Sequence, residues 1–354
     1  MSNVQRTSPA DQRNPTQTKK VMQTMKAIEQ AGYGSPDVLR CVEVDIPTIT
    51  DEQVLVRVDT AAANPLDWHF TTGTPWFLRL VAGLRHPKQP RRGVDMAGVV
   101  EAVGASVTDV RPGDAVFGGG AGAFAEFVVC RHDGVAPLPA GMSFGDAAAL
   151  PVAAVTALQG LRDHAGLRVG QSVLINGAGG GVGNAAVQIA HAMGVEVTAV
   201  CGTHNVEIVR SLGADHVIDY SETDLMTVGR RFDAILDNVG NRTLADCRRL
   251  LSDDGVLVMV SGPKRNRLLG PIARVARAKV RFVIGRQRAV TFTAKETHEE
   301  LMALAKLVES GSLRSVIDRS YPLDETADAI RYLAEGHARG KVLIKVADVT
   351  DAAR

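Results

Sequence analysis

One stretch near the middle of the chain, residues 171–200, constrains the fold most. It reads QSVLINGAGGGVGNAAVQIAHAMGVEVTAV, so an apolar run, a glycine cluster, a helical pattern and a second β-branched run follow one another. Ser172–Asn176 is typical of a buried parallel strand, and residues 182–193 carry apolar side chains at helical spacing. This order predicts a β-α-β unit whose glycines lie in a turn, where backbone amides and a helix N-terminus bind phosphate.

The glycine cluster matches the dinucleotide-binding fingerprint G-x-G-x-x-G, with one alteration. Its three positions fall on Ala178, Gly180 and Gly183, so alanine replaces the first glycine. Glycine-rich turns also serve purely structural roles, but here the strand, helix and second strand that the fingerprint requires are all present. We therefore expect a dinucleotide on this turn, with contacts from Ala178, Gly180, Gly181, Val182 and Gly183.

The residues after the second strand favour NADP(H) over NAD(H). An NAD site usually places an acid about 20 residues beyond the glycines, where it accepts from the ribose hydroxyl. Here the turn after Cys201 contains no acid, and an acid would repel a 2′-phosphate. The alternative is an ordinary turn. The expected contacts at this rim are Gly202, Thr203, His204 and, at the end of the strand-like segment 216–220, Tyr220.

Composition limits the remaining possibilities. The 354 residues suffice for two domains, and the net charge of +1 argues against nucleic acid as a partner. Four widely spaced cysteines without metal-finger spacing indicate a reducing cytoplasm. The polar residues 1–24 predict a disordered tail rather than a signal peptide, a short tail is expected at 348–354, and no apolar run approaches the length of a membrane span.

The rest of the chain divides into two predicted domains. Short alternating strands, broken by Gly, Pro and Asp, predict a β-barrel-like domain over 25–150 that is completed by 317–347. Residues 151–316 form the nucleotide-binding domain. The expected strands lie at 53–60, 98–103, 115–117, 124–129, 232–237, 255–260, 315–318 and 341–346, with helical patterns at 146–165 and 296–310.

In the second domain, the carboxyl ends of two predicted strands mark the nicotinamide position. Ligands of doubly wound sheets bind outside the carboxyl ends of the strands, beside the point where the strand order reverses. The contacts expected there are Asn238, Val239, Gly240 and Ser261.

A basic segment, residues 264–288, stands apart from both domains. It contains nine Lys or Arg residues and no acid, with apolar residues interleaved. Such a pattern is typical of a solvated helix face near an anionic cofactor, or of weak contact with an anionic membrane.

Several ordered motifs resemble the quinone oxidoreductase signature: NPLD at 64–67, GVDMAGVV at 93–100, GDAV at 113–116, LP at 150–151, TA at 156–157, GGVG at 180–183 and GKV at 340–342. Over about residues 25–346 the chain is similar to the zeta-crystallin-type branch of the medium-chain dehydrogenase/reductase superfamily. The resemblance implies a GroES-like β-barrel catalytic domain joined to a doubly wound Rossmann domain, with the active site in the cleft between them. It also implies a homodimer, for which 280–284 is a possible edge strand.

The resemblance also bears on metal. Zinc-dependent relatives place cysteine and histidine ligands at positions that correspond to Asn64, Val94 and Val152 here, and valine has no lone pair to offer. The cysteine-rich structural-zinc lobe has no counterpart either. We therefore expect no metal, and without a Lewis acid to stabilise an alkoxide, hydride addition to a quinone or conjugated enone is the coherent chemistry.

The motifs assign candidate catalytic residues, each with a plain alternative. Asn64 is expected to hydrogen-bond a substrate carbonyl or carboxamide, or else to cap its own turn. His69 falls where zinc alcohol dehydrogenases carry a proton-relay histidine, and its alternative is a histidine satisfied by backbone. Thr156 resembles the family's nicotinamide contact, or is an ordinary helix residue. Lys341 reaches the cofactor or substrate, or is a solvated strand lysine.

Three aromatic residues complete the candidate pocket. Trp68, Trp76 and Phe77 either line an apolar substrate slot or pack the seam between the domains, and Asp67 is expected to cap its loop. The leading hypothesis is an NADPH-dependent reductase of a small apolar carbonyl or quinone substrate. The alternatives are a reductase of aldehydes or acyl-chain enones, and a catalytically idle NADPH-binding protein.

Overall fold

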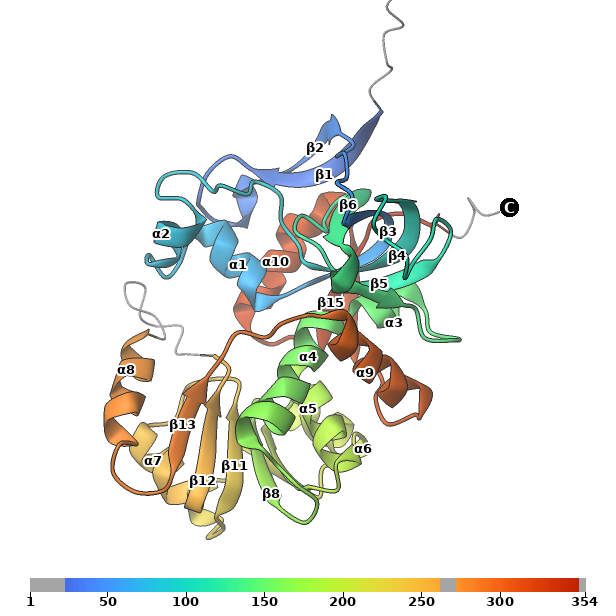
Figure 1. Cartoon of the computed structure of the whole chain (residues 1–354). Coiled ribbons are helices and arrows are strands. Elements are labelled where there is room, and N and C mark those ends of the chain that lie inside the picture. Colours follow the sequence, from blue (N-terminus) through green and yellow to red (C-terminus); the bar gives the residue numbers. More distant parts are fainter. Residues whose placement is uncertain (1–22, 262–271, 350–354) are drawn as a thin grey trace, which may run out of the picture.

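The computed structural model describes residues 23–261 and 272–349 and shows two domains, each built on a β-sheet (Figure 1). In that view the β-barrel-like sheet lies above and an all-parallel sheet lies below. Helix α4 (Pro151–Gln159) connects them, since it contacts β4 and β5 of the upper sheet and α5 of the lower domain. The predicted α/β fold, a GroES-like barrel plus a doubly wound Rossmann domain, is confirmed.

The parallel sheet has the strand order β10-β9-β8-β11-β12-β13. The order reverses between β8 and β11, which is the switch point where ligands of such sheets bind. Its strands are β8 (Ser172–Asn176), β9 (Glu196–Cys201), β10 (His216–Asp219), β11 (Phe232–Asp237), β12 (Leu251–Met259) and β13 (Arg288–Thr291). Its helices are α5 (Gly181–Ala192), α6 (Val206–Ser211), α7 (Leu244–Leu250) and α8 (Ile272–Arg281), with short turns η4 (Thr203–Asn205) and η5 (Leu225–Thr227).

Both faces of this sheet are covered, which is why its strands are apolar throughout. Val173 and Ile175 of β8 belong to a core shared with α4 and α5. Leu174 points the other way, into a core shared with α7 and α8. The alternation follows from the period of two along a strand, so each face receives its own set of helices.

The barrel-like sheet has the order β14-β15-β3-β4-β5-β7, and β6 also pairs with β3. Its strands are β3 (Gln53–Ala63), β4 (Asp95–Val103), β5 (Ala115–Gly119), β6 (Phe127–Arg131), β7 (Val135–Pro137), β14 (Ile317–Pro322) and β15 (Lys341–Lys345), beside the antiparallel pair β1 (Thr24–Gln30) and β2 (Leu39–Asp45). The remaining helices are η1 (Pro36–Val38), α1 (Pro65–Thr72), α2 (Leu78–Ala82), η2 (His132–Gly134), α3 (Phe144–Ala148), the π-helix η3 (Gly160–Ala165), α9 (His298–Glu309), η6 (Leu323–Glu325) and α10 (Thr326–Glu335).

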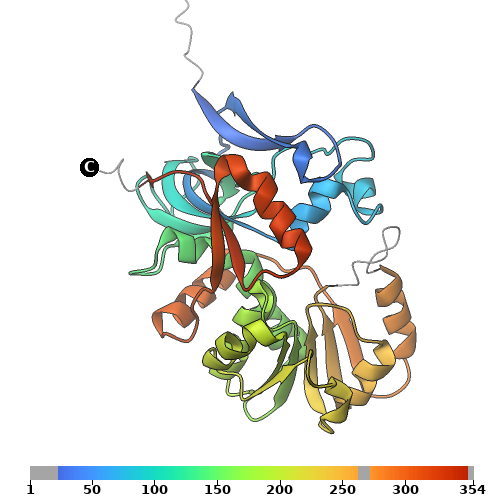
Figure 2. The same cartoon turned by 180° about the vertical axis from the view of Figure 1, so that it is seen from behind.

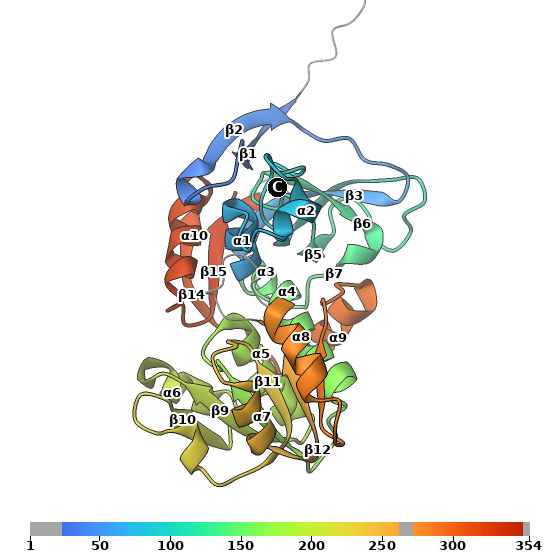
Figure 3. The same cartoon turned by 90° about the vertical axis from the view of Figure 1, so that its left-hand side faces the viewer.

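The C-terminal segment returns to the barrel. Strand β15 pairs antiparallel with β3, with Val342 opposite Ala63, and it pairs parallel with β14. Figure 2, seen from behind, shows α10 beside these two strands, and the buried Ala329 and Ile330 of α10 share the barrel core with Val342. In Figure 3 the barrel lies above the parallel sheet, and α9, which contacts β7 and α4, lies at the junction.

The edge strand expected at 280–284 is wrong. Val280 lies in the last turn of α8, and the strand at this edge of the sheet is β13. The β-branched residues suggested a strand, but Val275, Ala278 and Phe282 recur at helical spacing and pack against the sheet. The β-branched side chains that suggested the strand, Val280, Val283 and Ile284, are exposed.

Smaller differences concern strand starts and the chain ends. The strand expected at 124–129 begins later, at β6, and Ala125 only forms an isolated bridge with Ala27. Thr24, placed in the predicted N-terminal tail, opens β1, and residues 1–22 lie outside the described residues. Val349, placed in the C-terminal tail, is buried and its amide donates to Asp59 Oδ2 (3.2 Å).

Helix α8 is attached to the sheet by a buried ion pair. Arg274 Nη2 donates to Asp237 Oδ2 (2.6 Å) at the end of β11, and the two side chains are 11% and 1% exposed. Arg274 Nη1 also donates to the carbonyls of Gly240 (2.9 Å) and Arg242 (2.6 Å). Arg274 therefore belongs to the interior, while residues 264–271 of the predicted basic segment lie outside the described residues.

Replacing Arg274 with leucine is expected to lower the free energy of unfolding by about 3 kcal/mol, because Asp237 loses its cation while remaining buried. Arg277→Leu, on the exposed side of the same helix, is the matched control and should change it by less than about 0.5 kcal/mol. Urea denaturation followed by circular dichroism measures both. Equal effects of the two substitutions would contradict this role of Arg274.

Candidate active site

The glycine turn after β8 has the geometry of a phosphate-binding turn. Gly177 adopts φ +82°, so the left-handed residue precedes Ala178 and alanine fits the first fingerprint position without strain. A Cβ on Gly183 would lie 2.2 Å from the Gly177 carbonyl oxygen, so this glycine lets α5 pack closely on β8. At Gly180, which precedes the first turn of α5, the nearest such atom is 3.8 Å away, so its backbone is open to a ligand.

Two asparagines with unpaired polar atoms flank this turn. Among the described residues, Asn205 Oδ1 and both polar side-chain atoms of Asn238 are buried without a hydrogen-bond partner. A Cβ on Gly179 would lie 2.6 Å from Asn205 Cγ, and one on Gly177 would lie 3.5 Å from Asn238 Cβ. Buried polar groups are ordinarily paired. The phosphates and riboses of a dinucleotide would supply the missing partners, so these residues fit such a cofactor.

The other residues expected beside the nicotinamide differ in what they offer. The amides of Val239 (3.3 Å) and Gly240 (2.9 Å) donate to Asp237 Oδ1, so they shape the loop after β11. Ser261 is exposed just after β12. The Val182 side chain is partly buried against the core that α4 and α5 share. Among these residues, the Asn238 side chain is the one with buried polar atoms that lack a partner.

We call the residues expected beside the adenosine 2′-position, Gly202, Thr203, His204 and Tyr220, the adenosine rim. An acid that the sequence analysis missed, Asp219, lies beside it. Gly202 and Tyr220 are neighbours, since a Cβ on Gly202 would lie 2.9 Å from the Tyr220 hydroxyl oxygen. The Thr203 side chain is hydrogen-bonded to Asp219, and this bond is the main reason why the pKa of Asp219 is lowered; His204 adds a smaller attraction. Asp219 pairs with Cys201 in the parallel register of β10 and β9, which is how it reaches this rim.

Strands β4 and β15 and the starts of helices α1 and α4 meet in a buried corner of the barrel. Lys341 Nζ donates to Asp95 Oδ2 (2.8 Å) and to Asn64 Oδ1 (2.6 Å). Asn64 Nδ2 donates to the same Asp95 oxygen (3.0 Å), and Asp95 Oδ1 accepts from the Val152 amide (3.0 Å) at the start of α4. We call Asn64, Asp95 and Lys341 the cleft triad. Its members are distant in sequence but adjacent in the strand order β15-β3-β4.

The cleft triad adjoins the glycine turn. A Cβ on Gly181 would lie 2.9 Å from Lys341 Cδ, so the lysine stem crosses the first residue of α5. Lys341 is buried, and two of its three ammonium hydrogens are used within the triad. The third remains for a ligand. Both Nδ2 hydrogens of Asn64 have acceptors, Asp95 and the Ala62 carbonyl (3.4 Å), so in this structure Asn64 orients Lys341.

The structure gives the other predicted residues local partners. His69 Nδ1 donates to the Thr74 carbonyl (2.6 Å) at the end of α1, as in the plain alternative. The Thr156 hydroxyl donates to the Val152 carbonyl (2.6 Å) within α4. Trp68 packs against the barrel core. Trp76 is 59% exposed beneath the Arg79 guanidinium, so it does not line a closed slot, and Phe77 precedes α2 and is half-buried.

Two acids lie near the triad, the buried Asp67 and the half-buried Glu296. Asp67 accepts from the amides of Asn64 (2.8 Å) and Gly93 (3.2 Å), so it fixes the loop as expected, and burial raises its pKa to about 6. Glu296 was missed. Its Oε2 is buried without a hydrogen-bond partner, and burial, followed by the charge of Asp95, raises its pKa to about 8. It follows β13 in a stretch without a motif, so the sequence held no signal for it.

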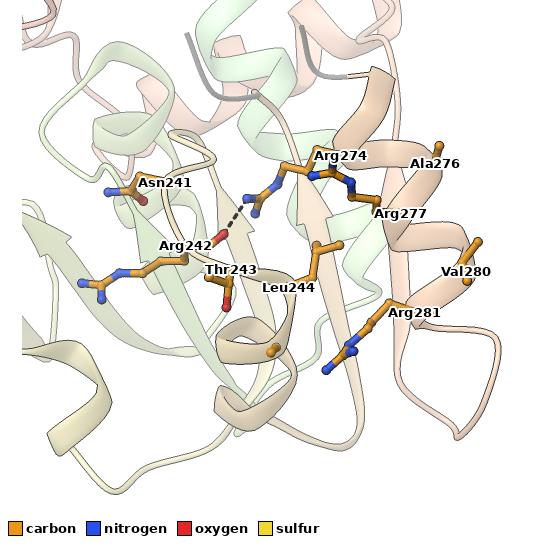
Figure 4. A pocket seen from close by; sticks show the side chains of 10 residues that line it. Asn241, Arg242, Thr243, Leu244, Arg274, Ala276, Arg277, Val280 and Arg281 are labelled. Atoms are coloured by element: carbon orange, nitrogen blue, oxygen red, sulfur yellow. Dashed lines mark hydrogen bonds between the residues drawn. The ribbon is translucent and has the colours of Figure 1, made fainter. Parts of the chain in front are cut away.

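Two other kinds of site were considered for the described residues: a metal cluster and the hollow in Figure 4. Within 23–261 and 272–349 no three His, Cys, Asp or Glu side chains are placed to hold a metal ion. The hollow, of about 810 Å³, opens between the start of α7 and α8, and Arg274 reaches across it to the Arg242 carbonyl. It lies on the sheet face opposite α4 and α5, away from the cleft triad.

Alanine at Gly180 and at Gly183 separates binding from folding. Gly180→Ala is expected to keep the fold and to weaken dinucleotide binding at least about tenfold, because the methyl group occupies the space above the turn. Gly183→Ala is expected to destabilise the protein, since its Cβ meets backbone. Fluorescence titration and thermal melting measure the two effects. Unchanged affinity of Gly180→Ala would exclude phosphate binding at this turn.

The raised pKa of Asp67 predicts a pH dependence of stability. The folded state binds this proton more tightly than the unfolded state, so stability is lost as the pH rises from about 4 to about 6, by roughly 2–3 kcal/mol. Asp67→Asn removes this contribution. The measurement is the difference in unfolding free energy between wild type and Asp67→Asn at several pH values, in which the other acids cancel. A difference independent of pH would refute it.

Comparisons with known proteins agree with this geometry. Residues 50–140 match the family model described as alcohol dehydrogenase GroES-like domain, and residues 212–344 match the one described as zinc-binding dehydrogenase. The chloroplast envelope quinone oxidoreductase homolog of Arabidopsis thaliana is 31% identical over 340 residues, which cover 91% of this chain and 98% of the relative. The NADPH-dependent alkenal/one oxidoreductase of the same plant is 31% identical, with 94% and 82% covered.

A solved structure extends the likeness to three dimensions. The quinone oxidoreductase from Coxiella burnetii superposes with a TM-score of 0.80 at 32% identity, covering 92% of this chain and all of that one. The covered part of the chain includes both sheets. The chain is therefore an oxidoreductase that belongs to the quinone oxidoreductase-like branch of the medium-chain dehydrogenase/reductase superfamily.

Proposed function

We propose that this protein uses NADPH to reduce a quinone or an α,β-unsaturated carbonyl compound, without zinc. The observation that carries the proposal is the buried Lys341 ammonium, held by Asp95 and Asn64 beside the glycine turn. Asn64 and Val152 correspond to zinc-ligand positions of the zinc-dependent relatives. Here the same corner holds a cation that belongs to the chain, together with an amide and a carboxylate.

This cation suits the charge that develops in the reaction. Bound NADPH supplies a hydride, and its addition to the acceptor carbon places negative charge on the acceptor oxygen. Lys341, with one hydrogen unused by the triad, would stabilise that oxygen, as an oxyanion donor does. Asp95 and Asn64 hold the ammonium in place. The delocalised anion of a quinone or enone needs less stabilisation than an alkoxide, which favours these acceptors over simple ketones.

The NADPH preference rests on the adenosine rim and on the relatives. The turn after β9 has no acid of its own, and the alkenal/one oxidoreductase is named as NADPH-dependent. The presence of Asp219 beside this rim argues against the NADPH preference, because an acid there can accept from the ribose hydroxyl of NADH. Its carboxylate is occupied by Thr203 and by the Ser221 amide (2.9 Å), which leaves His204 and Tyr220 for a 2′-phosphate. A lower Kd for NADH than for NADPH would assign Asp219 to the ribose and overturn the preference.

Further features of the proposal concern the whole molecule. We propose a cytoplasmic homodimer, as the family resemblance implies, with the sheet edge at β13 as its candidate contact. None of the helices within the described ranges has the length and apolar content needed to cross a bilayer. Weak association of the basic segment 264–288 with anionic lipid remains a prediction, now without Arg274, which is held in the interior.

The function is tested by stopped-flow loss of NADPH absorbance with an aromatic ortho-quinone, an enone and an aldehyde. Lys341→Met leaves Asp95 without its cation, so it is assayed at a temperature where melting shows it folded; there it is expected to lower kcat/KM for the quinone by about 10²-fold while NADPH still binds. Lys345→Met is the control, because Lys345 lies on the same strand but pairs with Asp59 and Asp348 (both 2.8 Å). NADPH binding without turnover of any acceptor would refute the reductase, and zinc required for activity would refute the metal-free mechanism.

A further inference from the structure

Glu296 is held in a defined position at the seam between the two domains. It lies between β13 and α9, and both of its sequence neighbours are anchored. The Lys295 amide donates to Gln159 Oε1 (3.1 Å), and its carbonyl accepts from Gln159 Nε2 (2.9 Å), which fixes this residue to α4. Thr297 caps α9 by accepting from the Glu300 amide (3.4 Å). The backbone therefore presents the Glu296 side chain to the barrel in one orientation.

The barrel makes room for this carboxyl group. A Cβ on Gly119, at the end of β5, would lie 2.3 Å from Glu296 Oε2, so the glycine leaves room for the carboxyl group in this position. The same Cβ would lie 3.5 Å from Val94 Cγ1, the residue before Asp95. Glu296 Oε2 has no hydrogen-bond partner within the described part of the chain. An unpaired buried carboxylate is costly, so the seam favours the protonated form.

Two charged groups from two other strands act on Glu296. Asp95 of β4 repels its charge and Lys341 of β15 attracts it, in that order of size. Cys130 of β6 is a neutral neighbour, because burial, followed by the charge of Glu296, raises the pKa of its thiol to about 12. Asp95 and Lys341 neutralise each other, and Asp67, with a pKa of about 6, has already lost its proton near pH 8, so the change in net charge here near pH 8 depends on Glu296.

We propose that Glu296 couples proton binding to the oxidation state of the bound nicotinamide, being protonated beside the reduced ring and ionised beside the oxidised ring. The inference rests on the proposed function and deepens it. An oxidised ring carries a positive charge that the reduced ring lacks, and a neighbouring carboxylate stabilises that charge. By linkage, NADP⁺ binding then releases a proton from Glu296, and a higher pH strengthens NADP⁺ binding relative to NADPH binding.

With this coupling, the protons and electrons of the proposed reduction are all accounted for. NADPH would supply a hydride to the acceptor carbon. Glu296 would release one proton to solvent, and the acceptor oxygen would take one proton from solvent. The acceptor thus gains two electrons and two protons, and Glu296 is left as a carboxylate opposite the cationic ring. It regains a proton from water when NADP⁺ leaves. Glu296 acts here through its charge on the nicotinamide ring. It therefore needs no contact with the substrate.

Calorimetry of nucleotide binding at pH 7, in two buffers of different ionisation enthalpy, counts the protons released. Wild type should release up to about one more proton with NADP⁺ than with NADPH, since the 2′-phosphate contributes equally to both. Glu296→Gln should abolish the difference. Glu299→Gln, an exposed glutamate on α9, is the matched control and should preserve it.

A second measurement needs no variant. In wild type, the ratio of the Kd for NADP⁺ to that for NADPH should fall as the pH rises toward and through about 8, by at most about tenfold per pH unit. Equal proton release for the two nucleotides, together with a constant ratio, would overturn the inference and leave the reductase proposal intact. Persistence of the difference in Glu296→Gln would assign it to another group. Failure of both nucleotides to bind would instead remove the proposed function.

Discussion

The contact between Lys341 and Asp95 is the interaction on which the architecture of the cleft depends. Both side chains are buried, and neither charge would be tolerated there alone. The pair joins the C-terminal strand to β4, and the second Asp95 oxygen accepts from the start of α4, which runs into the nucleotide-binding domain. One carboxylate therefore fixes a strand pairing, a helix start and the seam between two domains.

The local patterns of the sequence predicted the parallel domain well, because each strand and helix there has its own periodicity. Ser172–Asn176 and Phe232–Asp237 begin and end as expected. The error at 280–284 arose where β-branched residues follow a helical turn, so that local preference and tertiary packing disagree. There the buried face of α8 decides the structure.

The candidate site was predicted only in part, because its residues meet through strand order. Asn64 and Lys341 were identified from separate motifs, but nothing local indicates that they contact each other or share Asp95. Asp219 reaches the adenosine rim through the register of two parallel strands, and Glu296 through the space left by Gly119. Contacts of this kind depend on the assembled sheets. Asn205 and Asn238 likewise became informative only when their unpaired atoms were known.

The position of Lys341 near the end of the chain has a consequence for biosynthesis. Strands β3 and β4 leave the ribosome early, but the cation that neutralises Asp95 is translated after the whole parallel sheet. Domains generally fold as units while synthesis proceeds. The nucleotide-binding domain can therefore assemble first, and the barrel corner can close only after translation of β15. A nascent chain that stops short of Lys341 would expose an incomplete barrel to chaperones and proteases.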